Sequence, residues 1–347
     1  MASSDWADSL SVLVLHNLDP SWLPPEREEA AKEADAVVAA LRAEGCRVEP
    51  RCVDGPDLGA ALAGVDPDRV VVLNWCEELP GVPHSEALVT AELEGRGFAF
   101  TGSPSSVLLK SWDKVATKKM LRRSGVPTPR WRAFAAAEIK GWTRYPAIVK
   151  PAREHCSLGV TPQAVVLDRD ALLERVKYVL ETFAQPAIVE EFIDGREFHV
   201  TVWGDRTLNV LPPAEMDFSA LGEARDRLCS FDSKFQPGSH HWNSINVVLP
   251  AQLDEDEQRE LAKVAMAAFR AVGCRDYARI DLRQHGATFT VLDVNPNCDL
   301  STETSTALAA ELALGSYGAL LRRILGFAAA RHPCLAEDPV ARSRRGC

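Results

Sequence analysis

The chain has 347 residues, of which 46% are hydrophobic and 25% are charged, as is typical of a globular protein. Its formal net charge of −10 argues against a nucleic-acid partner, which would need a basic surface. No apolar run reaches the roughly 18 residues of a membrane span, and the N-terminus lacks the pattern of a secretory signal. The nine cysteines form no C-x-x-C pair, so we expect a cytoplasmic protein with reduced thiols and an exposed Cys347.

The N-terminal part of the chain alternates between short apolar strands and amphipathic helices. The strands are expected at 11–15, 47–52, 70–73 and 98–100, and the helices at 28–44 and 85–96. This alternation predicts a small doubly wound α/β domain over residues 10–103. Sheets of this kind bind ligands at the carboxyl ends of their strands, which lie near His16, Asn74 and Thr101.

The remainder of the chain predicts an α+β arrangement that follows a crossing segment at 104–130. Expected strands lie at 147–149, 163–167, 187–191, 197–202 and 207–211, and expected helices at 113–123, 170–183, 255–272 and 306–329. A loop-rich excursion occupies 212–250. A polar tail begins at Arg331, and we expect it to be frayed.

A predicted hairpin between Cys274 and Asp299 carries the most informative polar residues. Two apolar-rich runs flank a turn signal at 284–286, which is typical of a β-hairpin. Because side chains on a strand alternate between faces, one face is expected to be apolar: Ile280, Leu282, Leu292 and Val294. The opposite face then gathers four polar side chains: Arg279, Asp281, Asp293 and Asn295.

This polar face allows two interpretations. Two carboxylates and an amide oxygen suit Mg²⁺, and an arginine beside them can hold phosphate or stabilise developing negative charge. The alternative is an ordinary hairpin whose polar face is solvated. Strand alternation by itself does not choose between the two.

Several common nucleotide-binding signatures are absent from the sequence. It contains no G-x-x-x-x-G-K-[ST] phosphate loop and no G-x-G-x-x-G motif. Candidate phosphate ligands are Lys150, at the end of an apolar strand before a Ser/Gly loop, and Lys114, at a helix start. Each could equally be a solvated surface charge. Residues 189–193 place carboxylates beside apolar residues, a pattern that can contact an adenine amino group and ribose hydroxyls.

Together these segments resemble the ATP-grasp superfamily, and within it the D-alanine–D-alanine ligase branch. The resemblance covers residues 10–330, and it rests on the order and spacing of the matching segments. They are Glu26-Arg27-Glu28, Thr101-Gly102-Ser103, Asp113-Lys114, Thr117-Lys118, Val126-Pro127-Thr128-Pro129, Ile148-Val149-Lys150-Pro151, Ser157-Leu158-Gly159-Val160, Val189-Glu190-Glu191-Phe192, Gly195-Arg196-Glu197-Phe198, Arg279-Ile280-Asp281 and Leu292-Asp293-Val294-Asn295.

The resemblance implies an ATP-grasp fold of the α/β class, with α+β character in its C-terminal part. It implies a Rossmann-like, doubly wound pre-ATP-grasp domain at 1–103 and two α+β subdomains that clasp the nucleotide, at 104–190 and 191–330. A flexible tail would follow at 331–347.

The resemblance also implies roles for the matching residues. The nucleotide ligands would be Lys114 and Lys150 on the phosphates, Glu197 on the ribose, and Glu190, Glu191, Phe192 and Ile193 around the adenine. The metal ligands would be Asp281, Asp293 and Asn295, which would bind a pair of Mg²⁺ ions that Mn²⁺ can replace. The catalytic residues would be Arg279, Lys234 and Ser157, with the loop at 153–160 closing over the nucleotide.

The implied activity is ATP-dependent ligation of a small-molecule carboxylate to an amine. The carboxylate would take the γ-phosphate and release ADP, and the amine would then attack the acyl phosphate. Relatives of this kind are often dimers, so a homodimer is an alternative to the monomer. No membrane partner is expected.

Three positions qualify the resemblance. Asp293 stands where these ligases usually carry glutamate, and it is one methylene shorter. Asp299 falls near an expected glycine, where its charge would repel a substrate carboxylate, so we expect an acceptor other than D-alanine. Its alternative role is to cap a turn. Glu26 would lie near the amino group of the first substrate, although acids are also common at helix starts.

Other functions are compatible with the same residues. The acyl phosphate could drive an intramolecular cyclisation of an amino-acid derivative, or the protein could be a true D-alanine–D-alanine ligase. The non-enzymatic alternative is a catalytically silent nucleotide-binding protein. The retained set of lysine, arginine and acidic residues argues against the silent protein.

Overall fold

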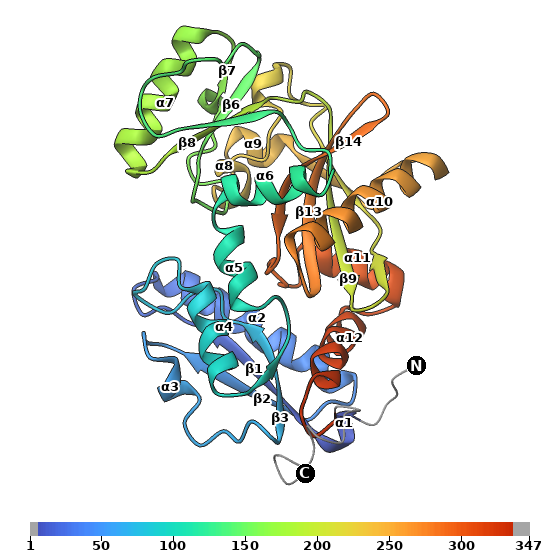
Figure 1. Cartoon of the computed structure of the whole chain (residues 1–347). Helices are drawn as coiled ribbons and strands as arrows, with labels where there is room; N and C mark the ends of the chain where they lie inside the picture. The colour runs from blue at the N-terminus through green and yellow to red at the C-terminus, as the bar shows by residue number, and fades with distance from the viewer. Residues whose placement is uncertain (1–5, 336–347) are drawn as a thin grey trace.

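The computed structural model describes residues 6–335. Within them the chain forms three β-sheets with helices on their faces (Figure 1). The first sheet is parallel, has the order β2-β1-β3-β4, and is drawn in blue in Figure 1. Its strands are β1 (Ser11–Asn17), β2 (Val48–Val53), β3 (Val70–Trp75) and β4 (Ala99–Phe100).

Both faces of this parallel sheet are covered by helices. Val12 and Val14 of β1 belong to one hydrophobic cluster with α2 (Pro24–Ala43) and α12 (Tyr317–Ala330). Leu13 and Leu15, which point the other way, pack in a second cluster with α3 (Leu58–Ala61) and α4 (Glu86–Gly95). Burial of alternate residues on two faces explains the continuous apolar strands. The expected doubly wound α/β arrangement is confirmed. A short helix α1 (Trp6–Ser9) precedes β1.

The expected helix at 306–329 is in fact two helices. α11 (Ser305–Leu314) ends at Gly315, whose φ of +83° suits glycine, and the Ser316 hydroxyl caps α12 by accepting from the Ala319 N–H at 2.9 Å. α12 returns to pack on α2 and β3 of the first sheet, as the red helix in Figure 1 shows. The end of the chain therefore completes the N-terminal core, and the division into domains stays a proposal.

Two consecutive helices link the first sheet to the second. α5 (Ser105–Ser111) was not predicted, whereas α6 (Lys114–Arg123) was. The Asp113 carboxylate caps α6 by accepting from the N–H groups of Val115 and Ala116 at 2.8 and 3.1 Å. The second sheet is antiparallel, in the order β5-β8-β6-β7, and α7 (Arg169–Phe183) covers one face. Its strands are β5 (Trp131–Phe134), β6 (Ala147–Pro151), β7 (Val165–Val166) and β8 (Ala187–Glu191).

The third sheet carries the predicted hairpin. Its strands run β12-β11-β9-β13-β14, with β10 paired to β9. They are β9 (Arg196–Gly204), β10 (Leu208–Val210), β11 (Ala214–Asp217), β12 (Asn246–Val248), β13 (Asp276–His285) and β14 (Thr288–Asn295). The long helix α10 (Glu255–Val272) covers the apolar face, where it meets Phe198, Val200 and Val202 of β9. The excursion at 212–250 contains β11, β12 and two short helices, α8 (Asp232–Phe235) and α9 (His240–Ser244).

The hairpin was predicted correctly except at one residue. Asp281 pairs with Asp293, but Leu282 pairs with Val291, so a β-bulge leaves Leu292 without a partner in the register. Val291 is fully buried and takes the place expected for Leu292, which is only partly buried. The bulge keeps Asp293 and Asn295 on the polar face while the apolar face stays continuous.

Two expectations about the end of the chain need correction. Arg331 is not frayed, because its guanidinium binds the Asp276 carboxylate with both contacts at 2.7 Å, and the neighbouring His332 is fully buried. Cys334 is disulfide-bonded, so reduced thiols are not found throughout. The free thiols are those of Cys46, Cys52, Cys76, Cys156, Cys229, Cys274 and Cys298. Cys347 and most of the expected tail lie outside the described residues. No helix within residues 6–335 has the length and apolar character of a membrane span.

Candidate active site

The polar face of the third sheet forms a regular array across β9, β13 and β14. His199, Asp281 and Asp293 lie opposite one another in one row of the register. Thr201, Arg279 and Asn295 form the next row. The hairpin therefore presents all four predicted polar residues on one face, and β9 adds further polar groups beside them. The side chains of Arg279 and Asp281 are only 21% and 16% exposed. The polar face is therefore largely shielded from water, unlike the solvated face of an ordinary hairpin.

Arg279 and Asp281 form a two-pronged ion pair on this face. Arg279 Nε lies 2.8 Å from Asp281 Oδ1, and Nη2 lies 3.1 Å from Oδ2. Burial alone would raise the pKa of Asp281, but the guanidinium of Arg279 and the nearby His199 and Lys234 lower it below its ordinary value. Asp281 is therefore ionised, and Arg279 is held at the centre of the array.

The three predicted metal ligands fit a hard cation. Asp293 uses Oδ1 to accept from the Val294 N–H at 3.0 Å, and Asn295 uses Oδ1 to accept from the Asn297 N–H at 3.1 Å. Each oxygen still has a free lone pair, and Asp293 keeps a second oxygen. Two carboxylates and one amide on adjacent strands match the all-oxygen preference of Mg²⁺. The residues present therefore fit this ion.

A buried cluster of charge lies where the second sheet meets the hairpin. Lys150 of β6 and Lys118 of α6 both bind the Glu190 carboxylate, at 2.9 and 3.0 Å. Burial opposes ionisation of Glu190, but the two ammonium groups lower its pKa. Glu190 was expected to face adenine, and in this structure its two oxygens are engaged by the lysines.

Lys118 was missed as a site residue. Its ammonium group also donates to the backbone carbonyls of Val291 and Leu292, at 3.3 and 2.8 Å, and to the Thr128 hydroxyl at 2.9 Å. It thus joins β8 of the second sheet to the strand that carries Asp293. The Thr117-Lys118 segment was among those that match the family. Lys118 was nevertheless not chosen, because a lysine in a helix is usually a surface residue.

The loop at 153–160 contacts Lys114 and the segment before α8. Lys114 donates to the Glu154 carbonyl, and the Ser157 hydroxyl donates to the Cys229 carbonyl at 2.9 Å. His155 stacks on Trp112 with ring centroids 3.9 Å apart. Burial lowers the pKa of Lys114, and Lys150 lowers it further, while Asp293 opposes them. Lys114 and Lys150 are therefore close to each other and to the predicted metal ligands.

Glu197 and its partner Arg283 extend the array at its far edge. Arg283 Nε lies 2.8 Å from Glu197 Oε2, and the side chains are 3% and 7% exposed. Arg283 also donates to the Ile193 carbonyl at 2.6 Å and lies over the Phe192 ring, 4.8 Å from its centroid. Arg283 therefore fixes the segment that was predicted to hold the nucleoside, and sequence reasoning did not identify it.

Known proteins match the part of the chain that contains these residues. The family model of the D-ala D-ala ligase C-terminus matches residues 115–325. The chain is 32% identical over 313 residues to a D-alanine–D-alanine ligase of Marinomonas sp. (strain MWYL1), covering 86% of this chain and 90% of that protein. It is 34% identical over 319 residues to the uncharacterized protein y4sG of Sinorhizobium fredii, covering 89% and 91%.

The chain belongs to the D-alanine–D-alanine ligase family. It is thus an ATP-grasp ligase of the ADP-forming, carbon–nitrogen bond-forming type. A solved D-alanine–D-alanine ligase from Bacillus anthracis, complexed with ATP, shares its fold with a TM-score of 0.69. That comparison has 20% sequence identity and covers 92% of this chain and 97% of the other.

Lys234, Glu191 and Phe192, which were also predicted as site residues, have different surroundings in this ligase. Lys234 of α8 acts electrostatically on Asp281 and Cys229, which places it beside the array. Glu191 is partly exposed and pairs with Arg144 at 3.5 Å. Phe192 is 7% exposed and packs in a hydrophobic cluster with Ile148 and Val165.

The two substrate candidates both make local capping bonds. Glu26 lies in the first turn of α2 and accepts from the Leu23 N–H at 2.8 Å. Asp299 accepts from the N–H of Ser301 at 2.8 Å and from its hydroxyl. Glu26 thus caps a helix start and Asp299 caps a turn, as the alternative interpretation of each residue expected. The second carboxylate oxygen of each residue is still available for a substrate contact.

Proposed function

We propose that this ligase joins the carboxylate of an amino-acid-like donor to an amine acceptor that carries no free carboxylate. The donor carboxylate attacks the γ-phosphorus of ATP, so that ADP leaves and an acyl phosphate forms. The amine then attacks the acyl carbon, phosphate leaves, and the amine gives up a proton. Such a ligase would serve a purpose other than cell-wall D-alanyl-D-alanine synthesis.

Three cations near the predicted metal ligands support the nucleotide part of this proposal. Lys114 of α6, Lys150 of β6 and Arg279 of β13 all interact electrostatically with Asp293, and there they would offset the charge of the phosphates. Asp281, Asp293 and Asn295 would hold Mg²⁺, which supplies charge neutralisation between phosphate groups. The related ligase from Bacillus anthracis was solved with ATP.

Two residues are proposed to act on the reacting groups themselves. Arg279 would stabilise the negative charge that develops on the tetrahedral intermediate, since its guanidinium is already held in place by Asp281. Ser157 would help to close the loop at 153–160 over the site through its bond to the Cys229 carbonyl, and thereby exclude water.

The acceptor preference rests on Asp299, which has a second acidic residue, Glu77, near it. Glu77 follows β3 and Asp299 follows β14, and the Asp299 carboxylate acts electrostatically on Glu77. Glu77 and Asp299 also act on Cys156 in the closing loop, as do Lys234 and Arg279. The Asp299 carboxylate would repel an anionic acceptor carboxylate placed beside it.

The test compares three acceptors that differ in charge. ADP release is measured with Mg-ATP, a donor amino acid, and either D-alanine, D-alaninamide or a diamine, and the products are identified by mass. We expect D-alaninamide or the diamine to be used at least about tenfold better than D-alanine. Equal or better use of D-alanine would refute the acceptor proposal. A product that has lost water without gaining an acceptor would indicate cyclisation, and no ADP with any substrate would indicate a silent protein.

A further inference from the structure

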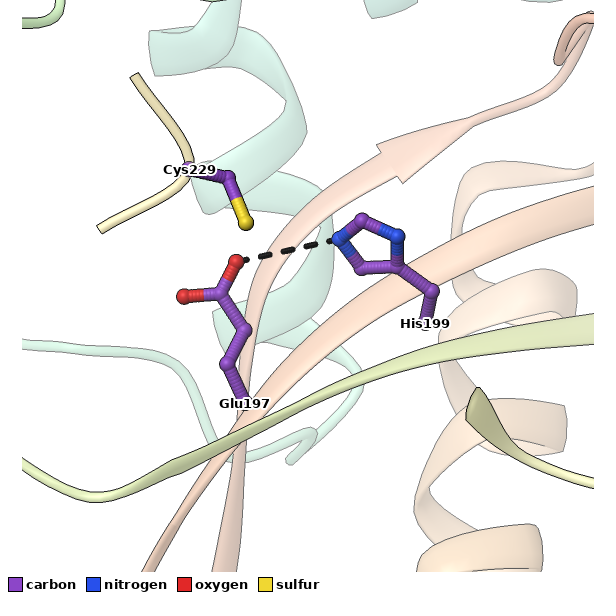
Figure 2. A group of neighbouring side chains, drawn as sticks. All are labelled: Glu197, His199 and Cys229. Atoms are coloured by element: carbon purple, nitrogen blue, oxygen red, sulfur yellow. Dashed lines mark ion pairs between the residues drawn. The ribbon is translucent and has the colours of Figure 1, made fainter. Parts of the chain in front are cut away.

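Three potential metal-ligating side chains converge at the edge of the polar array, outside the set predicted for Mg²⁺. They are Glu197, His199 and Cys229, and one ligand atom from each lies within 4.8 Å of the other two. Figure 2 shows the carboxylate, the imidazole and the thiol pointing toward one another. Glu197 and His199 occupy alternate positions on one face of β9, whereas Cys229 comes from the loop before α8.

The three groups lie close together in a largely buried setting. Glu197 Oε1 and His199 Nε2 lie 3.7 Å apart, and their side chains are 7% and 9% exposed. Cys229 Sγ lies within 4.8 Å of a ligand atom of each of the other two residues. Asp281 Oδ1 lies 3.9 Å from His199 Nε2, because Asp281 and His199 are paired in the register. One imidazole, one thiol and two carboxylates are thus available to a single ion.

The chemistry of this set differs from that of the Mg²⁺ ligands. Mg²⁺ takes oxygen ligands, whereas thiol and imidazole groups select a softer ion such as Zn²⁺. Zn²⁺ lies about 2.0–2.3 Å from its ligands, which places neighbouring ligand atoms about 3.3–3.8 Å apart in a tetrahedron. The separation of 3.7 Å between Glu197 and His199 is close to this value. Small side-chain movements would bring the Cys229 sulfur to the same separation from the other two ligand atoms.

We propose that Glu197, His199 and Cys229 form a binding site for one Zn²⁺ ion, with Asp281 within reach as a fourth ligand. Binding replaces the proton of the Cys229 thiol by the metal, so that one proton is released and no oxidant or reductant is needed. Glu197 and the thiolate then supply two negative charges to the ion, and Asp281 adds a third if it joins.

The positive groups around the site limit how tightly it can bind. Arg283 occupies Oε2 of Glu197 at 2.8 Å, which leaves Oε1 directed at His199. Arg279 contacts both oxygens of Asp281, so Asp281 has to share an oxygen or release the arginine. Lys234 also acts on Cys229 and Asp281. We therefore take Glu197, His199 and Cys229 as the core of the site.

The site has a consequence for the nucleotide, which rests on the proposed function. If Glu197 contacts the ribose, Zn²⁺ and ATP use the same carboxylate and exclude each other. Zn²⁺ would then inhibit the ligase, and a chelator would reverse the inhibition. The Cys229 carbonyl also holds Ser157, so a bound ion lies next to an anchor of the closing loop.

The metal test uses the full chain without an affinity tag and without nucleotide. Titration with Co²⁺ alone is followed by its absorption spectrum, and Zn²⁺ is then used to displace the Co²⁺. We expect one ion per chain and a thiolate-to-cobalt charge-transfer band. C229S and H199Q should each lose that band or weaken Zn²⁺ binding by more than about 100-fold. C52S, which alters an exposed free thiol, should bind like the parent protein.

The outcomes separate this proposal from the ligase proposal. The zinc site is refuted if no thiolate band forms, or if C229S and H199Q, shown to be folded by circular dichroism, bind Zn²⁺ like the parent chain. Neither result affects ADP release by the metal-free protein, which tests the ligase. Zinc binding that is independent of ATP concentration would keep the site and refute the contact of Glu197 with ribose.

Discussion

Lys118 and Glu190 form an ion pair in which Nζ and Oε1 are 3.0 Å apart and the side chains are 3% and 1% exposed. The same ammonium group reaches the carbonyls of Val291 and Leu292 on the hairpin. One side chain thus connects the charge cluster of the second sheet to the strand that carries Asp293. A buried ion pair is costly to break, because the remaining partner is left without compensation.

Replacing Lys118 with methionine should therefore destabilise the fold strongly. K118M leaves Glu190 with Lys150 as its one ion-pair partner among residues 6–335 and removes two bonds to β14. We expect a loss of about 3–5 kcal/mol in the free energy of unfolding, measured by urea denaturation. K119M removes an exposed lysine from the same helix and should change it by less than about 0.5 kcal/mol. Similar losses in both variants would show that the bonds of Lys118 contribute little.

Gly159 in the loop at 153–160 should not tolerate a side chain. Its φ is +75°, and a Cβ atom there would lie 2.8 Å from Phe183 Cζ and 2.9 Å from Pro151 Cγ. G125A is the matched control, because Gly125 has a φ of +70° and open space around the added atom. Both variants should lose about 1–2 kcal/mol of unfolding free energy to backbone strain.

The crowding at Gly159 should add a further loss of about 1–3 kcal/mol in G159A, and it should raise the KM for ATP. Urea denaturation and initial-rate kinetics measure the two effects. Equal losses of stability in G159A and G125A, with an unchanged KM, would mean that the loop adapts to the methyl group.

His155 should make the stability of the protein depend on pH. Burial lowers its pKa from 6.5 to about 4, with Lys114 acting in the same direction. The unfolded chain therefore binds a proton at a higher pH than the folded one. Stability is fully present above the unfolded pKa of 6.5 and is lost as the pH falls toward 4.

The predicted loss between about pH 7 and pH 5 is about 2 kcal/mol from this one group. H155F keeps an aromatic ring against Trp112 but cannot be protonated. Urea denaturation at both pH values should therefore show a loss smaller by about 2 kcal/mol in H155F than in the parent protein. Parallel pH dependence in the two proteins would show that His155 does not titrate as proposed.

Removing the charge of Asp299 should change which acceptor is used. D299N keeps an oxygen that can accept from the Ser301 N–H, so the turn is preserved while the repulsion is relieved. We expect kcat/KM for D-alanine to rise about tenfold relative to that for D-alaninamide. E303Q, which removes an exposed charge nearby, should leave the ratio unchanged. A constant ratio in D299N would assign Asp299 to turn capping alone.

The sequence predicted the fold and much of the site because long periodic segments and ordered motifs carry them. The parallel sheet, α10 and the hairpin all followed from hydrophobic period and turn signals. Short elements such as β5, α5 and β12 were missed, since a few residues show no clear period. The break between α11 and α12 depends on one glycine with a positive φ, which a helix pattern does not reveal.

The site residues that escaped prediction depend on contacts between distant segments. His199 alternates with Phe198 and Val200, but only the register of β9 with β13 places it opposite Asp281. Lys118 resembled any helical lysine until its partners on β8 and β14 were known. Because of the bulge, Val291 takes the buried position that was expected for Leu292. A period-two hydrophobic pattern cannot predict such a register shift.

The most direct test of the ligase assignment is ADP release by the parent protein and by R279A under identical Mg-ATP and substrate conditions. Arg279 is held by Asp281 at the centre of the array, and its removal should lower kcat by about 100- to 1000-fold while circular dichroism stays unchanged. R270A, at an exposed position on α10, should retain the parent rate. A folded R279A that releases ADP at the parent rate would contradict the account.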